Sequence, residues 1–286
     1  MADFSKTWTW YNGDWHEGNP PLMGPRSHAF WLGSSVFDGA RVFEGVMPDL
    51  DLHCARTNNS ARALGMNPTM EVGQMMELTN EGASKFNKDH AIYVRPTYWG
   101  VGEGAGVISV NPDEIDFCLT MFEAPMPTAP GIRITSTAFR RPTLECMPVN
   151  AKAGCLYPNN SRCLNEAIAK GFDNALVCDM LGNVAELATA NIFMVKNGIV
   201  KTPVPNGTFL NGITRQRVIK LLRDAGLQVE EQTLSLDDFR TADEVFATGN
   251  YSKVTSVLAY DTSEYGTGPI AQKAKELYWS FAHDQL

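Results

Sequence analysis

A proline-rich run near the middle of the chain most strongly limits how the chain can fold. Residues 123–131 read Glu-Ala-Pro-Met-Pro-Thr-Ala-Pro-Gly. Proline fixes φ and has no backbone N–H, so this run has few regular hydrogen-bonding options and is typical of a linker. The sequence therefore predicts a small N-terminal domain over residues 1–122, a linker over 123–131 and a larger domain over 132–286.

Hydrophobic periodicity predicts strands and helices on both sides of this linker. Alternating or short apolar runs predict strands at 7–11, 91–95, 115–122, 132–138, 174–178, 192–195 and 199–202. Helical apolar spacing predicts helices at 52–64, 72–86, 161–170, 214–225 and 269–281. The two kinds of element follow no regular βαβ period, which favours an α+β fold over a doubly wound sheet.

Composition argues against several classes of partner. The chain has 286 residues and a formal net charge of −8, so nucleic acid and anionic membrane surfaces are poor partners. Its cysteines form no CxxC pair and its histidines no HxxxH pair, so we expect neither a metal site nor a disulfide scaffold. No secretory signal is visible in Met1–Lys6, and no apolar run approaches the roughly 18 residues that span a bilayer. We expect a cytoplasmic protein.

Two phosphate-binding signatures are absent. The glycines of Gly100–Gly106 fall at every second position, whereas a dinucleotide fingerprint requires G-x-G-x-x-G between a strand and a helix. No G-x-x-x-x-G-K-[ST] motif occurs either. The glycine-rich stretch is therefore predicted to be a loop.

The segment Asn150–Tyr157 contains the first candidate for chemistry. Lys152 is flanked by Ala151, Ala153 and Gly154. A lysine among small neutral neighbours can be held where water is scarce, which lowers its proton affinity and makes its amine a nucleophile. A lone lysine is more often an ordinary surface residue, so this interpretation depends on motifs further along the chain.

Two such segments support it. Glu186 stands just before a hydrophobic run that we predict to be a strand. Further on, Asn211-Gly212-Ile213-Thr214-Arg215 leads into a predicted helix. The free amides and the dipole at a helix N-terminus bind phosphate.

Taken in order, Ala-Lys-Ala-Gly-x-x-Tyr, Glu-x-x-x-x-Asn-Ile-Phe and Asn-Gly-Ile-Thr-Arg resemble class IV aminotransferases, which use pyridoxal 5′-phosphate (PLP). The most similar family is the branched-chain amino acid aminotransferases. Gly33–Arg41 is also similar to that family's G-[TS]-S-V-F-E-G-x-R. The resemblance covers nearly the whole chain. It implies the two-domain type IV fold, with a small α/β N-terminal domain and a larger C-terminal pseudo-barrel domain.

The resemblance also implies roles for residues that bind the cofactor. Lys152 matches the lysine linked covalently to PLP, Glu186 the carboxylate facing its pyridine nitrogen and Tyr157 the tyrosine bonded to its phenolic oxygen. The cofactor phosphate is expected to be held by Arg56, Ile213, Thr214 and Asn250. The family often has threonine or serine at the position of Asn250.

The resemblance implies that a second set of residues recognises the substrate. Tyr93 and Arg95 match a Tyr-x-Arg pattern and share one face of a strand, where they can meet an α-carboxylate. Phe37 and Tyr251 complete the expected substrate residues, and Tyr251 is bulkier than usual there. The family's Trp-Gly-x-Tyr-Leu-Gly stretch, which lines the aliphatic pocket, is replaced by the proline-rich linker, and Leu32 stands where a tyrosine is common.

The predicted function is therefore transfer of an amino group between an α-amino acid, branched-chain-like, and a 2-oxo acid. The resemblance also implies a homodimer or a higher even assembly. An (R)-selective amine transaminase remains open because the aliphatic pocket departs from the family. A D-amino-acid enzyme would need an Arg-x-His pair in place of Tyr93-Val94-Arg95. A lyase of the aminodeoxychorismate type shares the fold. A non-catalytic binding protein would not need both Lys152 and Glu186.

Overall fold

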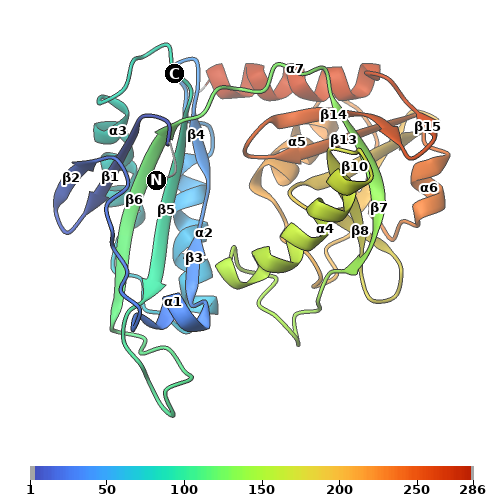
Figure 1. Cartoon of the computed structure of the whole chain (residues 1–286). Coiled ribbons are helices and arrows are strands. Elements are labelled where there is room, and N and C mark those ends of the chain that lie inside the picture. Colours follow the sequence, from blue (N-terminus) through green and yellow to red (C-terminus); the bar gives the residue numbers. More distant parts are fainter. Residues whose placement is uncertain (1–3, 285–286) are drawn as a thin grey trace. The chain divides into compact units, whose positions relative to one another are not determined.

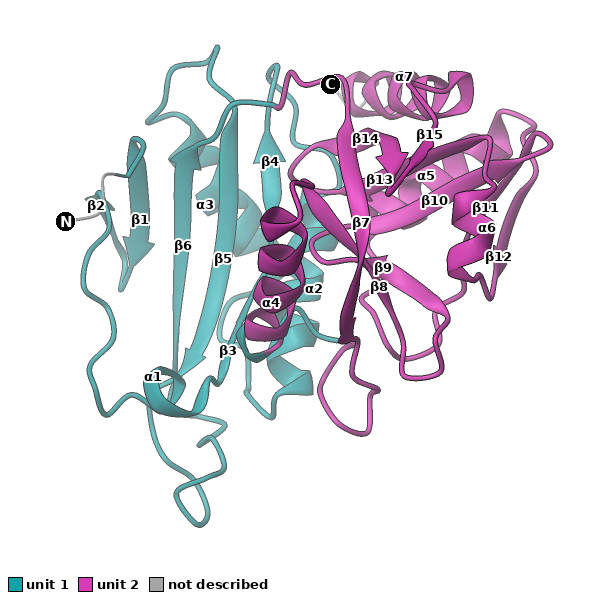
Figure 2. Ribbon diagram, turned by 45° about the vertical axis from the view of Figure 1, so that its right-hand side comes forward, with its two compact units in different colours: residues 1–126, 151–155, 285–286 teal, residues 127–150, 156–284 magenta. Residues whose placement is uncertain are grey.

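The computed structural model describes residues 4–284 and divides them into two compact units (Figure 2). Unit 1 comprises residues 4–126 and 151–155, and unit 2 comprises 127–150 and 156–284. The sequence placed 151–155 in the C-terminal domain, whereas this segment packs with unit 1. Its attachment is a bridge between Ala153 and Val36. The domain boundaries inferred from the sequence stay a prediction. Met1 to Asp3, part of the segment searched for a secretory signal, lie outside the described residues.

Unit 1 is an antiparallel sheet with two helices packed against it (Figure 1). The strand order is β2-β1-β6-β5-β3, and β4 also pairs with β5. The strands are β1 (Thr7–Tyr11), β2 (Asp14–Glu17), β3 (Ser35–Phe37), β4 (Ala40–Val42), β5 (Ile92–Gly100) and β6 (Ile115–Glu123). The helices are α1 (His28–Leu32), α2 (Leu50–Ala63) and α3 (Val72–Ala83).

Unit 2 is built on a second sheet, in the order β12-β11-β10-β13-β14-β7-β8-β9, with β15 paired to β14. Contacts of β9 with β10 and β11 curl this sheet back on itself. Its strands are β7 (Ile132–Arg140), β8 (Asn174–Cys178), β9 (Val184–Leu187), β10 (Asn191–Lys196), β11 (Ile199–Pro203), β12 (Val229–Gln232), β13 (Glu244–Gly249), β14 (Lys253–Tyr260) and β15 (Ser263–Glu264). The helices are α4 (Tyr157–Ala169), α5 (Ile213–Asp224), α6 (Leu236–Arg240) and α7 (Pro269–His283).

Both faces of β10 are buried. Ile192 and Met194 belong to one core cluster, while Phe193 and Val195 pack in another with side chains of α5 and α7. Because successive side chains of a strand point to opposite faces, a strand buried on both sides reads as a continuous apolar run. This explains the uninterrupted Ile-Phe-Met-Val, and it makes β10 a rigid base for the residues at its start.

The helices and strands predicted from the sequence are present, with two instructive differences in length. Helix α4 begins at Tyr157 rather than near Ser161, because Pro158 is compatible with the first turn of a helix. Strand β5 continues to Gly100, so the glycine-rich stretch begins inside the sheet. Among the described residues, no helix is long and apolar enough to cross a membrane, and no cluster of ligands suits a metal ion.

Candidate active site

Lys152 is held in unit 1 by its backbone. Its N–H donates to Ser60 Oγ on α2, at 3.0 Å, and its carbonyl accepts from the N–H of Phe37, at 3.1 Å. Its Nζ lies 4.9 Å from the centroid of the Phe37 ring. The small neighbours allow this close approach, since a Cβ on Gly154 would overlap Ser35 Oγ. The small residues that mark the segment in the sequence thus let it pack against β3.

Arg56 lies on α2 and forms a forked ion pair with Asp38. Its Nε and Nη2 donate to the two carboxylate oxygens at 2.6 and 2.9 Å, and His53 Nδ1 lies 2.7 Å from Asp38 Oδ1. Asp38 is completely buried. It stands where the resembling family has glutamate, a residue with one more methylene. The fork fixes the orientation of the guanidinium, and its Nη1 takes no part in the pair with Asp38.

This cluster sets the ionisation of Asp38. Burial raises the pKa of the carboxyl group, but the charge and hydrogen bonds of Arg56, with those of His53, outweigh it and hold the pKa well below its usual range. A carboxyl group whose pKa is lower in the folded than in the unfolded state adds stability above its unfolded pKa of about 3.9. That stability is lost as the pH falls towards the folded-state pKa.

We therefore expect Asp38→Asn to lower the stability of the protein by about 3 kcal/mol at pH 7, because the half-buried Arg56 and the buried His53 would lose the carboxylate that they share. The difference from wild type should shrink as the pH falls below about 4, where the unfolded wild-type chain takes up the proton. Urea unfolding midpoints at pH 7 and pH 3 measure this. The exposed Asp14→Asn is the control and should match wild type. Equal midpoints for Asp38→Asn and Asp14→Asn at pH 7 would contradict the assignment.

Tyr93 and Arg95 lie on the less buried face of β5, as their spacing predicts. The Tyr93 ring stacks on Phe122, with ring centroids 5.2 Å apart. The Arg95 guanidinium lies over the same ring of Phe122, 4.8 Å from its centroid. These aromatic contacts hold the arginine against the sheet while the residue stays exposed.

In unit 2, Glu186 is a buried carboxylate that precedes β10, the strand predicted after it, and that itself lies within β9, which was not predicted. Its Oε1 lies 3.1 Å from Nη2 of Arg141, and its Oε2 accepts from Nδ2 of Asn191 at 3.3 Å. Arg141 is itself buried and also donates to the carbonyl of Thr208 and to Asn160 Oδ1. A buried carboxylate needs such partners to stay charged. The sequence offered no signal for Arg141.

Asn191 connects this carboxylate to the start of α5. Its Oδ1 accepts from the N–H of Gly212, the N-cap of α5, at 3.2 Å, and its Nδ2 also donates to the carbonyl of Leu210. A Cβ at Gly212 would overlap the Asn191 side chain. The first turn of α5 carries Ile213 and Thr214, whose amides are free of intrahelical partners by position. Asn191 is the asparagine of the Glu-x-x-x-x-Asn pattern found in the sequence. Its contacts with Glu186 and Gly212 were not predicted.

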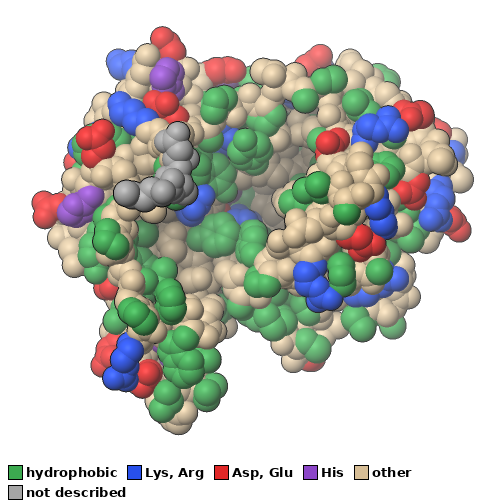
Figure 3. Space-filling model, viewed as in Figure 1, with side chains coloured by type: hydrophobic (Ala, Val, Ile, Leu, Met, Phe, Trp, Pro, Cys, Tyr) green, Lys and Arg blue, Asp and Glu red, His purple; other side chains and the backbone are tan. Residues whose placement is uncertain are grey.

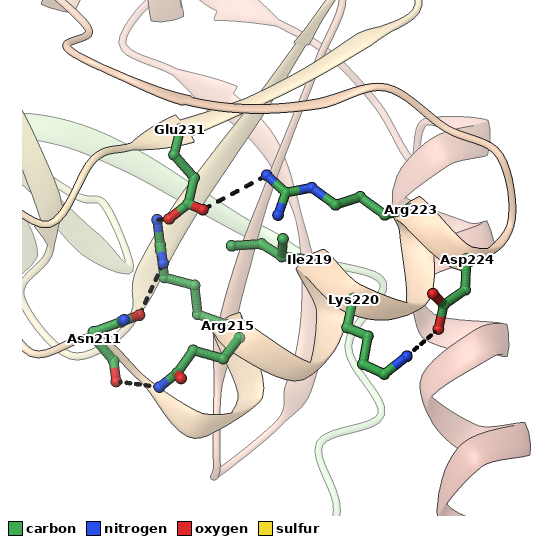
Figure 4. A pocket seen from close by; sticks show the side chains of 8 residues that line it. Asn211, Arg215, Ile219, Lys220, Arg223, Asp224 and Glu231 are labelled. Carbon is green, nitrogen blue, oxygen red and sulfur yellow. Dashed lines mark hydrogen bonds and ion pairs between the residues drawn. The ribbon is translucent and has the colours of Figure 1, made fainter.

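Arg215 clamps the loop that precedes α5 (Figure 4). The residue is 1 % exposed, and it donates to Asn211 Oδ1, the carbonyl of Pro203 and Glu231 Oε2. A surface cavity of about 350 Å³ lies beside it. The other charged residues that line this cavity are also paired, as Lys220–Asp224 and Arg223–Glu231. The hydrogen bonds and ion pairs of these lining residues thus hold the loop and α5 in place.

The turn between β13 and β14 follows a strand that pairs with β10 at Asn191. Thr248 faces Asn191 in the pairing of β13 with β10. Thr248 Oγ1 and Asn250 Nδ2 are buried atoms without a hydrogen-bond partner among the described residues. Buried polar atoms are normally satisfied, so this turn suits a polar ligand with acceptor oxygens. Tyr251 and Tyr157 are exposed side chains on this unit.

These residues fit the two ends of PLP. Glu186 offers a buried negative charge, while α5 and Asn250 offer donors suited to phosphate, and Asn191 lies beside both groups. Unit 2 thus brings together Glu186, Ile213, Thr214 and Asn250. Unit 1 brings Lys152 beside Phe37, and places Arg56 one turn from Ser60 on α2.

Several known proteins are similar to this chain. A family model described as amino-transferase class IV matches residues 35–260. A crystal structure of an aminotransferase from Brucella abortus, bound to PLP, is 56% identical, with a TM-score of 0.96 over 97% of this chain and 99% of that chain. The branched-chain amino acid aminotransferase of Escherichia coli is 27% identical, with a TM-score of 0.87 over 98% of this chain and 95% of that one.

One relative by sequence is a probable branched-chain-amino-acid aminotransferase from Rickettsia conorii, 31% identical over 94% of this chain and 93% of the relative. The family model alone spans most of the chain, from β3 to the end of β14. The chain therefore belongs to the class IV aminotransferases and has their type IV fold, as its motifs predicted.

Proposed function

We propose that this class IV aminotransferase transfers an amino group between an α-amino acid, branched-chain-like, and a 2-oxo acid, with PLP as its cofactor. PLP is bound in the Brucella abortus relative, and the residues of unit 2 fit it. One observation carries the proposal. Asn191 bonds both to the buried carboxylate of Glu186 and to the N-cap of α5, so an acid for the ring and donors for the phosphate occur together.

When bound, PLP supplies a ring that withdraws electrons from the substrate α-carbon. Lys152 holds the cofactor covalently and, once released, moves the proton to and from that carbon. Glu186 keeps the proton on the pyridine nitrogen, and Tyr157 donates to the phenolic oxygen. Arg56, Ile213, Thr214 and Asn250 bind the phosphate. Tyr93 and Arg95, with Phe37 and Tyr251, orient the substrate.

The carboxylate of the substrate separates this proposal from the amine alternative. Arg95 keeps an exposed guanidinium against Phe122, where a charge-assisted bond to a carboxylate is typically worth about 1.5–3 kcal/mol. Purified enzyme with PLP and 2-oxoglutarate or pyruvate should therefore turn over leucine, glutamate or alanine faster than either enantiomer of 1-phenylethylamine. Faster turnover of (R)-1-phenylethylamine than of leucine would establish the amine transaminase instead.

Arg95→Ala provides the matching variant. We expect kcat/KM for an amino acid or a keto acid to fall by roughly ten- to a hundredfold, since the carboxylate loses a charged partner. The half-reaction with the uncharged amine should change much less, and a general loss of fold would affect both reactions. Arg26→Ala, an exposed arginine of the same unit, is the control. Unchanged keto-acid turnover in Arg95→Ala would remove the carboxylate role from this strand.

We also propose that the enzyme is a homodimer. Apolar side chains gather at the end of unit 1, over α1 and the loop between β5 and β6 (Figure 3). Phe30, Trp31, Val107 and Ile108 are exposed there, and His28 joins the two segments through the carbonyl of Ile108. Such a patch is typical of a surface that another protein chain covers. Sedimentation of the purified protein measures the mass of the assembly directly.

A further inference from the structure

Lys253 is an unusual residue for its position. It is the first residue of β14, it is completely buried, and its φ is +61°. Lysine is rarely buried without a partner, and residues other than glycine seldom adopt a positive φ. A residue that combines both features is held by its surroundings, and such strained positions cluster at functional sites.

The ammonium group of Lys253 lies beneath the β13–β14 turn. Its Nζ donates to Asn250 Oδ1 at 2.6 Å and lies 5.6 Å from the centroid of the buried Tyr278 ring of α7. Its backbone pairs with Gly249, the last residue of β13. Lys253 and Asn250 are therefore the two ends of one tight connection, and the lysine reaches back to the asparagine.

This contact decides which way the Asn250 side chain points. An ammonium group can only donate hydrogen bonds, so it selects the amide oxygen and rejects the amide nitrogen. The carboxamide is planar, and Nδ2 must then point away from Lys253. In the structure, Asn250 Nδ2 is buried and has no hydrogen-bond partner among residues 4–284. Without Lys253, the Asn250 side chain could turn either its amide oxygen or its amide nitrogen to this side. With Lys253 bonded to the oxygen, only the donor Nδ2 faces away from the lysine.

We propose that Lys253 is a positioning residue for the cofactor phosphate, holding the Asn250 amide so that Nδ2 donates to a phosphate oxygen. This inference rests on the proposed function. The place is suitable, because Thr248 faces Asn191 across the sheet and Asn191 bonds to the N-cap of α5. A threonine or serine hydroxyl, which the family often has at this position, rotates freely and would need no such orientation.

Lys253→Met removes the donor and keeps a long side chain. We expect the dissociation constant for PLP to rise by about tenfold, since the freed amide no longer keeps its donor towards the phosphate. Binding of pyridoxal, which lacks the phosphate, should stay within about twofold of wild type. Equilibrium dialysis of the apoenzyme measures both constants. Lys275→Met, an exposed lysine over Trp279 on α7, is the matched control and should bind both molecules as wild type does.

The Asn250→Thr background separates orientation from charge. There the hydroxyl needs no orienting lysine, so adding Lys253→Met should leave the PLP dissociation constant unchanged. A tenfold loss that persists in Asn250→Thr would overturn the proposal, because it would show that the charge or the packing of Lys253 is what matters. Equal PLP affinity of Lys253→Met and wild type would overturn it as well.

Asn250→Asp tests the direction of the donor while the buried lysine stays in place. An aspartate has the same shape, keeps an oxygen towards Lys253 and turns a second oxygen towards the phosphate. We expect it to weaken binding of PLP and of inorganic phosphate to the apoenzyme by tenfold or more, through loss of the donor and repulsion between anions. Wild-type affinity in Asn250→Asp would contradict the proposed orientation. Failure of the wild-type apoenzyme to bind PLP at all would instead contradict the proposed function.

Discussion

Lys152→Ala is expected to lose the covalent link to PLP and to reduce transamination by roughly a thousandfold or more, because one side chain both holds the cofactor and transfers the proton. Only a side chain with a free amine can do both. Lys152→Arg should fail in the same way, since a guanidinium keeps the charge but remains protonated. The backbone of this segment is bonded to Ser60 and Phe37, so the fold should survive both changes.

Absorbance of the purified variants and steady-state turnover with leucine and 2-oxoglutarate measure this result. Lys170→Ala is the control, since Lys170 is exposed and its ion pair with Glu166 lies on the surface of α4. It should keep both the absorbance and the rate of wild type. Turnover of Lys152→Ala within tenfold of wild type would rule out its role as the catalytic amine.

Glu186→Gln is expected to bind PLP and yet to slow the chemical step by roughly a hundred- to a thousandfold, or several kcal/mol of barrier. Glutamine has the same shape but no charge, so the ring nitrogen loses the group that keeps it protonated. Arg141, 3.1 Å away and buried, would at the same time lose its counter-charge, so a lower stability is also expected.

Single-turnover rates separate these two effects, because chemistry is followed on enzyme that is folded and loaded with PLP. Glu166→Gln is the matched control in the same unit. Glu166 bonds to Lys170 and Thr137, which hold its pKa at about 2, and it has no proposed contact with the cofactor. It should retain the wild-type rate. A wild-type single-turnover rate in Glu186→Gln would exclude Glu186 as the acid for the ring.

Motifs that are local in sequence could be predicted without the structure. Lys152 was identified by its small neighbours and α5 by its glycine before an amphipathic helix, and both descriptions match the structure. The strand predicted at 192–195 is present as β10, whereas β9, which contains Glu186, was not predicted, because it is four residues long and carries no alternation of its own. Local patterns report helices and strands well when their hydrophobic periodicity is long.

Contacts between distant segments could not be predicted. Arg141 and Glu186 meet only because β7, β8 and β9 are neighbours in the sheet, and nothing around Arg141 distinguishes it from other arginines. Lysine side chains are mostly exposed, and nothing in the sequence marks Lys253 as the exception that is buried under the β13–β14 turn. Pairing across a sheet is set by packing, which a single sequence records weakly.

The same limit affected the assignment of residues 151–155. The linker signal at 123–131 was strong, so the sequence placed everything after it in one domain. The structure instead returns this segment to unit 1, through hydrogen bonds with α2 and β3. The small residues of this segment are visible in the sequence, but they do not indicate which unit the segment packs against.

Reduction of the purified holoenzyme with borohydride, followed by peptide mass mapping, tests the central claim most directly. Borohydride fixes the link between PLP and its lysine as a stable pyridoxyl group. We predict one pyridoxyl group per chain, on the peptide that contains Lys152. A pyridoxyl group on another lysine, Lys253 included, or none in a protein that turns over amino acids, would contradict the account.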